Sequence, residues 1–425
     1  MNSTNQLVRH IANALADDRV MRHNADLPAA SLAEEKELAR KVAQKHIRDG
    51  RQPTEWGLLP IEESDEELVD EAINLVLGLG RLEPLLADDE ISDIHVRGNS
   101  NVWLKMRTGE RREHEPIVDT DDELVDLIRR MAARMGHREQ RFDPAHPELN
   151  LQLGDGSRVF ATMEVSARPS LVIRRHRFEY SDLNQLVNLG MLEESTAGFL
   201  SAAVRSRHNL VISGGTGSGK TTLLRALINE IPRTERIVTI EDAFEIGLDR
   251  FADAHPDHDS LQARFANSEG SGAVTMSDLA RMALRMDPDR VVIGEVRGAE
   301  AFPMLLAMSQ GNNGSMCTMH ADSPRNVFPK LLSYVSMAQT GVPMEAVNLL
   351  ISTSIHFVIQ VQIVNGRRRV VSIHEVAQSD GSGVSSNEIF SMYDPSLNFV
   401  TMKMKTQQSL EQCGFSAGSE VSWAR

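Results

Sequence analysis

A glycine-rich run that ends in lysine and threonine has the clearest chemistry in this sequence. Its residues are Gly214, Gly215, Thr216, Gly217, Ser218, Gly219, Lys220, Thr221 and Thr222. The apolar segment LVIS precedes the run and the helix-forming segment LLRALINEI follows it, which is the context that a Walker A loop requires. An ordinary flexible turn would need neither the GKT ending nor these flanks. The run therefore predicts a loop that binds ATP with Mg²⁺.

Each part of such a loop has a physical task. Glycines allow successive backbone N–H groups to point at phosphate oxygens near a helix N-terminus. Lys220 is expected to reach the β- and γ-phosphates, and the Thr221 hydroxyl is expected to help hold Mg²⁺. Lys220 is therefore a candidate for both binding and catalysis.

A second candidate segment is acidic and follows the next apolar run. Glu241 and Asp242 come directly after Ile237-Val238-Thr239-Ile240, and Glu245 lies three residues further on. Acidic residues after a strand often belong to a solvated loop or cap a helix. Because this cluster follows the phosphate loop and its helix, we expect Glu241 to face Mg²⁺ and its waters and to act in catalysis.

The third segment is an apolar strand from Asp289 to Gly298 that ends in Gly294-Glu295. Many Walker B strands end in Asp-Glu, so glycine stands here where the metal-holding aspartate would be. Mg²⁺ would then depend on Thr221, phosphate oxygens and water-mediated acidic contacts. Glu295 remains placed to polarise the attacking water and is the predicted catalytic carboxylate.

The last strand-like segment, Ser315 to Met319, is followed by His320. A single histidine is commonly a surface or capping residue. In this context it predicts a contact with the γ-phosphate, or a link between nucleotide state and the neighbouring segment, since imidazole can donate a hydrogen bond to an anionic oxygen. Cys317 within the strand is expected to pack in the core.

Four arginines lie at the edge of the predicted small domain and at the start of the predicted large domain: Arg158, Arg174, Arg175 and Arg177. Phosphoryl transfer often uses a cation from outside the phosphate loop. Basic runs also form solvated faces or ion pairs. Arg174 and Arg158 are the preferred arginine-finger candidates because they flank a predicted domain boundary.

These residues require a scaffold that brings strand ends together. Apolar segments 209–213, 236–240, 290–294 and 315–319 alternate with helical patterns, which predicts a mainly parallel sheet covered on both faces. Catalytic groups of such a sheet gather where the strands end. Asn365-Gly366 between two apolar runs predicts a β-hairpin over 355–376.

The length of 425 residues suits more than one domain. Residues 1–60 predict a helical, partly mobile extension, and 61–168 a small α+β domain with a helix at 65–79, strands at 91–96 and 101–106, and a helix at 121–135. Residues 169–380 predict a RecA-like ATPase domain. The Ser-, Gly- and Gln-rich segment 381–425 predicts a weakly structured tail.

Composition narrows the function further. The formal net charge is −15, with 60 acidic against 45 basic residues, which disfavours binding to a phosphate backbone. The two cysteines, Cys317 and Cys413, provide neither a disulfide framework nor a CxxC metal site. The sequence has neither a signal-peptide pattern nor an apolar run of about 18 residues, so a cytosolic protein is expected.

The ordered segments GGTGSGKTT, IEDAFEI, PDRVVIGEVRGAEA and GNNGSMCTMHADSP resemble the secretion traffic ATPases of type II and type IV systems, especially the tight-adherence pilus branch. The resemblance covers residues 61 to about 376. It assigns Lys220 and Thr221 to the Walker A pair, Glu295 to Walker B and His320 to the His box. It assigns Glu241, Asp242 and Glu245 to the Asp-box segment. Asn312 stands where that family commonly has the first His-box histidine.

The resemblance also implies a fold, an assembly and partners. It implies an N-terminal domain stacked on a RecA-like C-terminal domain in a hexameric ring, with ATP at the joint. An inner-membrane platform protein is the implied partner, and the ring is expected to associate peripherally with that membrane. Two isolated cysteines cannot form the tetracysteine zinc site of some type II relatives. A RecA-like nucleic-acid motor and a non-hydrolysing ATP-binding regulator are the alternatives.

Overall fold

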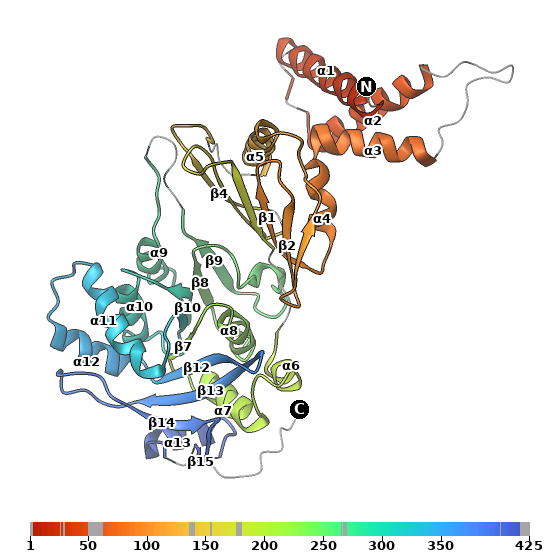
Figure 1. Cartoon of the computed structure of the whole chain (residues 1–425). Helices are drawn as coiled ribbons and strands as arrows, with labels where there is room; N and C mark the ends of the chain where they lie inside the picture. The colour runs from red at the N-terminus through yellow and green to blue at the C-terminus, as the bar shows by residue number, and fades with distance from the viewer. Residues whose placement is uncertain are drawn as a thin grey trace. The chain divides into compact units, whose positions relative to one another are not determined.

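The computed structural model describes residues 3–25, 27–28, 30–49, 63–135, 141–153, 155–175, 181–264, 266, 270–399 and 401–416. The chain forms two compact units, Met1–His176 and Arg177–Arg425 (Figure 1). Each unit has its own sheet and its own apolar core. None of the described helices is both long enough and apolar enough to span a bilayer.

Three helices at the start of the first unit share a small apolar core: α1 (Ser3–Asn24), α2 (Leu32–Asp49) and α3 (Glu63–Leu77). The predicted helical extension contains α1 and α2. Val69, Ile73 and Leu77 of α3 belong to the same core as Leu7 and Ile11 of α1. The predicted boundary at residue 60 therefore falls inside a packing unit, because α3 packs on the extension.

The first unit also contains a six-stranded antiparallel sheet in the order β3-β2-β1-β6-β5-β4. Its strands are β1 (Ile91–Arg97), β2 (Val102–Met106), β3 (Arg111–His114), β4 (Glu148–Gln152), β5 (Arg158–Thr162) and β6 (Ser170–Arg174). The short helices η1 (Gly80–Leu82) and α4 (Glu83–Ala87) precede the sheet. Helix α5 (Asp121–Met135), with the predicted bounds, packs Leu124 and Ile128 into the core of the sheet.

The last strand of this sheet corrects a predicted boundary. Strand β6 pairs with β1 on one side and β5 on the other, so it completes the first sheet. The sequence placed residues 169–174 in the second domain because an apolar run after a Pro-Ser turn resembles the start of a βαβ unit. The first unit instead extends to His176.

The second unit is built on a nine-stranded sheet in the order β15-β14-β13-β12-β7-β11-β10-β8-β9. The strands are β7 (Leu210–Gly214), β8 (Ile237–Glu241), β9 (His258–Gln262), β10 (Arg290–Val296), β11 (Met316–Met319), β12 (Phe357–Val364), β13 (Arg367–Val376), β14 (Ser386–Ser391) and β15 (Asp394–Asn398). The six from β12 to β9 are parallel. The predicted parallel sheet is confirmed, and the predicted hairpin is β12–β13, with Asn365 and Gly366 at positive φ.

Helices cover both faces of this sheet, as the alternation of strands and helices predicted (Figure 1). One core contains residues of α6 (Leu183–Asn188), α7 (Glu194–Arg205), α8 (Lys220–Ile228) and α13 (Met404–Glu411). The other contains residues of α9 (Met276–Ala283), α10 (Ala301–Ser309), α11 (Val327–Met337) and α12 (Met344–Ser354). Short turns η2 (Leu248–Arg250) and η3 (Pro324–Asn326) complete the unit.

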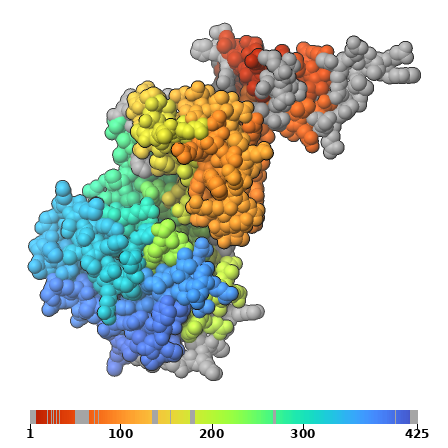
Figure 2. Space-filling model, viewed as in Figure 1, coloured from red at the N-terminus to blue at the C-terminus, as the bar shows by residue number. Residues whose placement is uncertain are grey.

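Residues 381–399 and 401–416, which the structure describes, include the strands β14 and β15 and the helix α13, whereas the sequence predicted a weakly structured tail. Phe399 stacks on Phe199 of α7 at a ring-centroid distance of 4.5 Å and on Phe390 at 5.3 Å. Phe415 meets Phe399 edge-on at 5.4 Å. Figure 2 shows the blue C-terminal part of the chain closely packed into the second unit. Three phenylalanines thus fix a segment whose Ser, Gly and Gln content suggested disorder.

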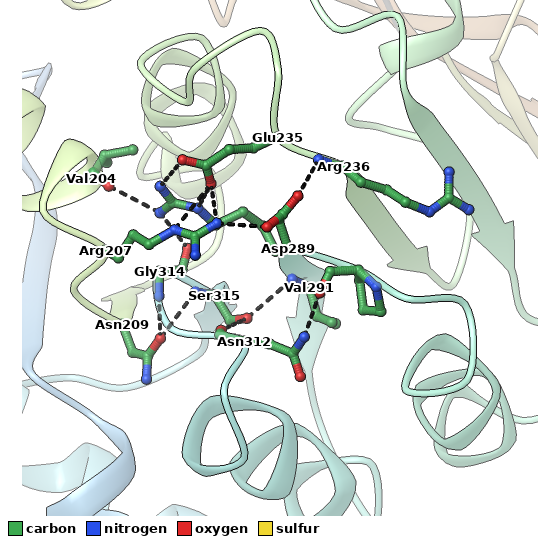
Figure 3. A network of polar contacts seen from close by, with 12 residues as sticks. Val204, Arg207, Asn209, Glu235, Arg236, Asp289, Val291, Asn312, Gly314 and Ser315 are labelled. Carbon is green, nitrogen blue, oxygen red and sulfur yellow. Dashed lines mark hydrogen bonds and ion pairs between the residues drawn. The ribbon is translucent and has the colours of Figure 1, made fainter.

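A network of polar contacts, which includes Glu235, Asn209 and Gly314, joins the amino ends of the central strands (Figure 3). Arg290, at the start of β10, has no exposed side-chain surface and donates to Glu235 through Nε at 2.5 Å and through Nη2 at 3.2 Å. Its Nη1 donates to the carbonyl oxygens of Val204 at 2.9 Å and Gly314 at 3.2 Å. Asn209 accepts from the N–H of Gly314 at 2.7 Å. These contacts therefore hold together the amino ends of the strands, whereas the predicted catalytic residues lie at the carboxyl ends.

Candidate active site

The predicted phosphate loop connects the end of β7 to the start of α8. Gly217 and Gly219 have φ values of 72° and 100°, a region that glycine occupies with little strain. A Cβ placed on Gly215 or Gly217 would meet nothing within 4 Å, so one side of the loop is open. Lys220 is the first residue of α8, so this open loop leads directly into a helix N-terminus.

Lys220 lies folded over the loop. Its Nζ donates to the carbonyl oxygens of Gly214 at 3.1 Å and Gly215 at 2.9 Å, and the Ser218 hydroxyl donates to the same Gly215 oxygen at 2.8 Å. Burial lowers the pKa of Lys220, against the opposing effect of the Glu295 charge. These donors bond neutral carbonyls here, and an anionic phosphate oxygen is a stronger acceptor. The loop therefore fits a polyphosphate.

Glu241, at the end of β8, organises the acidic segment from within the protein. Its Oε2 accepts the N–H groups of Glu245 at 2.7 Å and Ile246 at 2.8 Å. Burial raises the pKa of Glu241 to about 7, although these N–H bonds act in the opposite direction. Among the described residues, no group bonds its buried Oε1. A direct Mg²⁺ contact of Glu241 stays a prediction.

Glu245 is the acidic residue that lies beside the Walker A threonine. The Thr221 hydroxyl donates to Glu245 Oε2 at 3.3 Å, and Arg225 of α8 donates through Nε to the Glu245 carbonyl oxygen at 2.9 Å. The hydroxyl and carboxylate oxygens are ligands that suit Mg²⁺. Within the described ranges, no three His, Cys, Asp or Glu side chains are grouped as a metal site. Thr221 and Glu245 therefore fit a Mg²⁺ that phosphate oxygens also bind.

The glycine at the Walker B aspartate position has a steric explanation. A Cβ on Gly294 would lie 3.2 Å from Cγ and 3.6 Å from Oε2 of Glu241. The Thr318 hydroxyl donates to the Gly294 carbonyl oxygen at 2.6 Å, which fixes the strand in place. The Glu241 side chain thus occupies the room that an aspartate at residue 294 would need.

Glu295 lies between two nitrogen groups at the end of β10. His320 Nε2 is 2.9 Å from Glu295 Oε1, and Arg297 Nε donates to Glu295 Oε2 at 2.8 Å. Burial and the charge of Lys220 lower the pKa of His320. His320 is therefore mainly neutral near pH 7. The structure brings the predicted residues Glu295 and His320 together, on the same unit as Lys220.

Arg297 was missed as a site residue. Its Nη1 also lies 3.6 Å from Asp242 Oδ2, so its guanidinium links the acidic segment after β8 to Glu295. Arg297 follows the last residue of β10, two residues after Glu295, and this short separation is the available sequence signal.

The predicted arginine fingers belong to the first unit. Arg158 of β5 and Arg174 of β6 are paired in register in the antiparallel sheet. Arg175 Nη1 donates to the Ile91 carbonyl oxygen at 3.4 Å, and Arg175 Nη2 lies 3.7 Å from Asp89. Arg177 lies outside the described residues. The finger roles of Arg158 and Arg174 stay predictions.

Comparisons with known proteins identify the family of this chain. The family model described as type II/IV secretion system protein matches residues 79–403. A putative conjugal transfer protein of Mycobacterium tuberculosis is 35% identical over 314 residues, 72% of this chain and 86% of that protein. The type IV secretion system protein VirB11 of Brucella suis is 28% identical over 359 residues, 78% of this chain and 93% of that protein.

Among solved structures, the X-ray structure of the Legionella pneumophila ATPase DotB has a similar fold. Its TM-score is 0.51 at 20% identity, over 69% of this chain and 79% of that chain. The family match spans the phosphate loop, Glu241, Glu295, His320 and the β12–β13 hairpin. By this match and by its identity to the mycobacterial protein, the chain belongs to the type II/IV secretion system protein family.

Proposed function

We propose that this chain is an ATP-hydrolysing motor of a secretion or pilus machine. Family membership supports a role in such a machine, and the geometry of the phosphate loop supports ATP binding. The observation that carries the proposal is the position of Glu295, which lies against His320 and Arg297 and whose charge acts on Lys220. A water that attacks a γ-phosphate needs a carboxylate in such a place.

Each residue of the site has a separate role in the proposed ATP hydrolysis. The loop N–H groups, Ser218 and Lys220 bind the β- and γ-phosphates and stabilise the charge that develops on them. Glu295 orients a water and accepts its proton while the water oxygen bonds to the γ-phosphorus. The bond from that phosphorus to the bridging oxygen breaks, and ADP and phosphate leave. The neutral His320 ring, whose Nε2 lies 2.9 Å from Glu295 Oε1, limits the movement of the Glu295 carboxylate.

The cofactor assignment follows from the same residues. Bound Mg²⁺ supplies positive charge to the β- and γ-phosphate oxygens. Thr221 and Glu245 would hold it, and Glu241 and Glu295 would contact it through water. Glu241 also shapes the loop that presents Glu245, which gives it an indirect role in metal binding.

The assembly is also part of the proposal. The chain acts as a homo-oligomeric ring, expected to be a hexamer, in the cytoplasm at an inner-membrane platform protein. Arg158 and Arg174 supply cations to the nucleotide within or between subunits. The tight-adherence pilus branch is the proposed machine, and the net charge of −15 supports a partner other than nucleic acid.

The test is steady-state ATP hydrolysis by the wild type and Glu295→Gln at increasing protein concentration, with particle mass measured in parallel. We expect turnover that rises with ring assembly and falls by about 10²–10³-fold in Glu295→Gln. Binding of a fluorescent ATP analogue should be retained in the variant. ATP binding without turnover in both proteins would contradict the motor and indicate a regulatory ATP-binding subunit.

A further inference from the structure

The β12–β13 hairpin contacts the phosphate loop at its start, middle and end. Val361 of β12 lies beside Gly214, where an added Cβ would be 2.3 Å from the Val361 carbonyl oxygen. Arg368 of β13 donates through Nε to the Gly217 carbonyl oxygen at 3.0 Å. An added Cβ on Gly219 would be 3.0 Å from Arg368 Cδ. The hairpin therefore follows the outer side of the whole loop.

Two further features fix the hairpin in this place. The N–H of Val370 donates to the Met191 carbonyl oxygen at 2.8 Å, and Met191 Cε would lie 3.3 Å from the same added Cβ on Gly219. The register of the hairpin shifts between Gln360 and Val361, next to the start of the loop. Such irregularities change the direction of side chains along a strand.

We propose that Arg368 is a positioning residue that holds the phosphate loop in its binding conformation. The C=O and N–H of a trans peptide unit point in opposite directions. The bond from Arg368 to the Gly217 carbonyl oxygen therefore directs the N–H of Ser218 away from the hairpin, and the nitrogen of this N–H lies 3.4 Å from the Gly215 carbonyl oxygen that Lys220 also contacts. A glycine-rich loop loses much conformational entropy on ordering, and an external bond reduces what a ligand must supply.

The inference deepens the proposed function, since it rests on nucleotide binding by this loop. It assigns Arg368 no contact with the reacting atoms. Loss of its guanidinium should therefore weaken the binding of ADP and ATP to the same extent, and the effect should appear in KM rather than in kcat. A cation that contacts the γ-phosphate would instead affect ATP more than ADP.

The test compares Arg368→Met, which keeps an unbranched stem beside Gly219, with Arg367→Met, an exposed neighbour at the hairpin turn. Both changes are made in the full-length Glu295→Gln chain, so that affinity is measured without turnover, using fluorescent ADP and a fluorescent ATP analogue. Arg368→Met should weaken both ligands about tenfold, as expected for one charge-assisted hydrogen bond. Arg367→Met should leave both affinities unchanged.

Further measurements separate positioning from folding. The thermal midpoints of the two variants should agree, and amide hydrogen exchange over residues 215–219 should be faster only in Arg368→Met. Arg368→Lys should restore part of the affinity. Unchanged affinity in Arg368→Met, an equal loss in Arg367→Met, or a loss for ATP alone would overturn the inference. If the parent Glu295→Gln chain binds neither nucleotide, the proposed function itself fails.

Discussion

Two ionisable residues of the site have pKa values that follow from where they lie. Glu241 is almost completely buried, and burial raises its pKa to about 7. His320 is partly buried near the Lys220 charge, and both effects lower its pKa. Both shifts favour the neutral form. The site therefore has less charge near pH 7 than its residue types suggest, and two pH-dependent effects follow.

The first effect concerns folding stability. Below a pH of about 4.5, Glu241 is protonated in both the folded and the unfolded chain. As the pH rises toward 7, the unfolded chain releases this proton and the folded chain retains it, so the free energy of unfolding falls. We expect a loss on the order of 3 kcal/mol by pH 7.5 from this group. Glu241→Gln should remove that part of the pH slope in urea unfolding.

A matched control separates this group from the rest of the chain. Glu345, in the first turn of α12, is an exposed carboxylate, and Glu345→Gln should leave the slope as in the wild type. The same slope in Glu241→Gln and Glu345→Gln would contradict the origin assigned here.

The second effect concerns the rate. Because the pKa of His320 is lowered, its neutral form should persist at pH 6.5, and kcat should fall only at lower pH as a further positive charge forms near Lys220 and Arg297. His320→Gln should lower kcat at pH 7.5 by about tenfold, because the Glu295 carboxylate loses the imidazole that lies 2.9 Å from its Oε1. The difference between the two pH–kcat profiles is the measurement. A low-pH fall of equal size in His320→Gln would assign it to another group.

At the scale of elements, polar contacts join the amino ends of the central strands, and the predicted catalytic residues lie at the carboxyl ends. The Arg290–Glu235 pair and Asn209 join the amino ends of the strands. At the carboxyl ends, Glu241 and Glu295 lie in the last residues of β8 and β10, and His320 directly follows β11. Rigid strands position side chains more accurately than loops do. The buried contacts of Arg290, Glu235 and Asn209 should therefore contribute to folding stability without contacting the nucleotide.

Removal of the Arg290 guanidinium leaves Glu235 with Arg207 as its remaining ion-pair partner, and it takes one donor away from the buried carbonyl oxygens of Val204 and Gly314. Arg290→Met should lower the free energy of unfolding by about 3 kcal/mol. Arg281→Met should change it by less than about 1 kcal/mol, because the Arg281–Asp278 pair is exposed. Denaturant unfolding of both variants checks this. If Arg290→Met with Glu235→Gln recovers none of the loss, the charge of Glu235 is not its source.

Local signals explain which elements could be predicted. The four catalytic strands each begin and end within two residues of the predicted segments, because each is a short apolar run before a polar or glycine-rich end. The turn at Asn365 and Gly366 has its own signal, since both tolerate positive φ. The contact of Arg368 with Gly217 has no such signal, because 151 residues separate the two positions.

Non-local packing likewise explains the errors. Phe399 and Phe415 pack on Phe199, which is far away in the sequence, and Phe390 packs on Phe399. The composition of the C-terminal segment alone therefore could not predict these contacts. The boundary before β6 was misplaced for a similar reason, since the pairing of β6 with β1 joins residues about eighty positions apart.

At the scale of the whole chain, the family match and the two compact units differ in extent. The match begins at residue 79, after α3, and ends at residue 403, before α13. The helices α1 to α3 therefore lie outside the matched segment and form a separate apolar core. At the other end, α13 and Phe415 belong to the core of the second unit although they also lie outside the match.

The C-terminal segment should consequently behave as part of the core. Phe399 is 1% exposed and holds a backbone φ of 61°, an unusual value for a bulky residue, so its ring packing must compensate for local strain. Phe399→Ala should lower the free energy of unfolding by about 3–5 kcal/mol. Met404, at the start of α13, is 74% exposed, and Met404→Ala should cost less than about 0.5 kcal/mol. Equal small effects of Phe399→Ala and Met404→Ala in denaturant unfolding would contradict a structural role of this segment. The expected difference between the two variants would show that the segment is part of the core of the second unit.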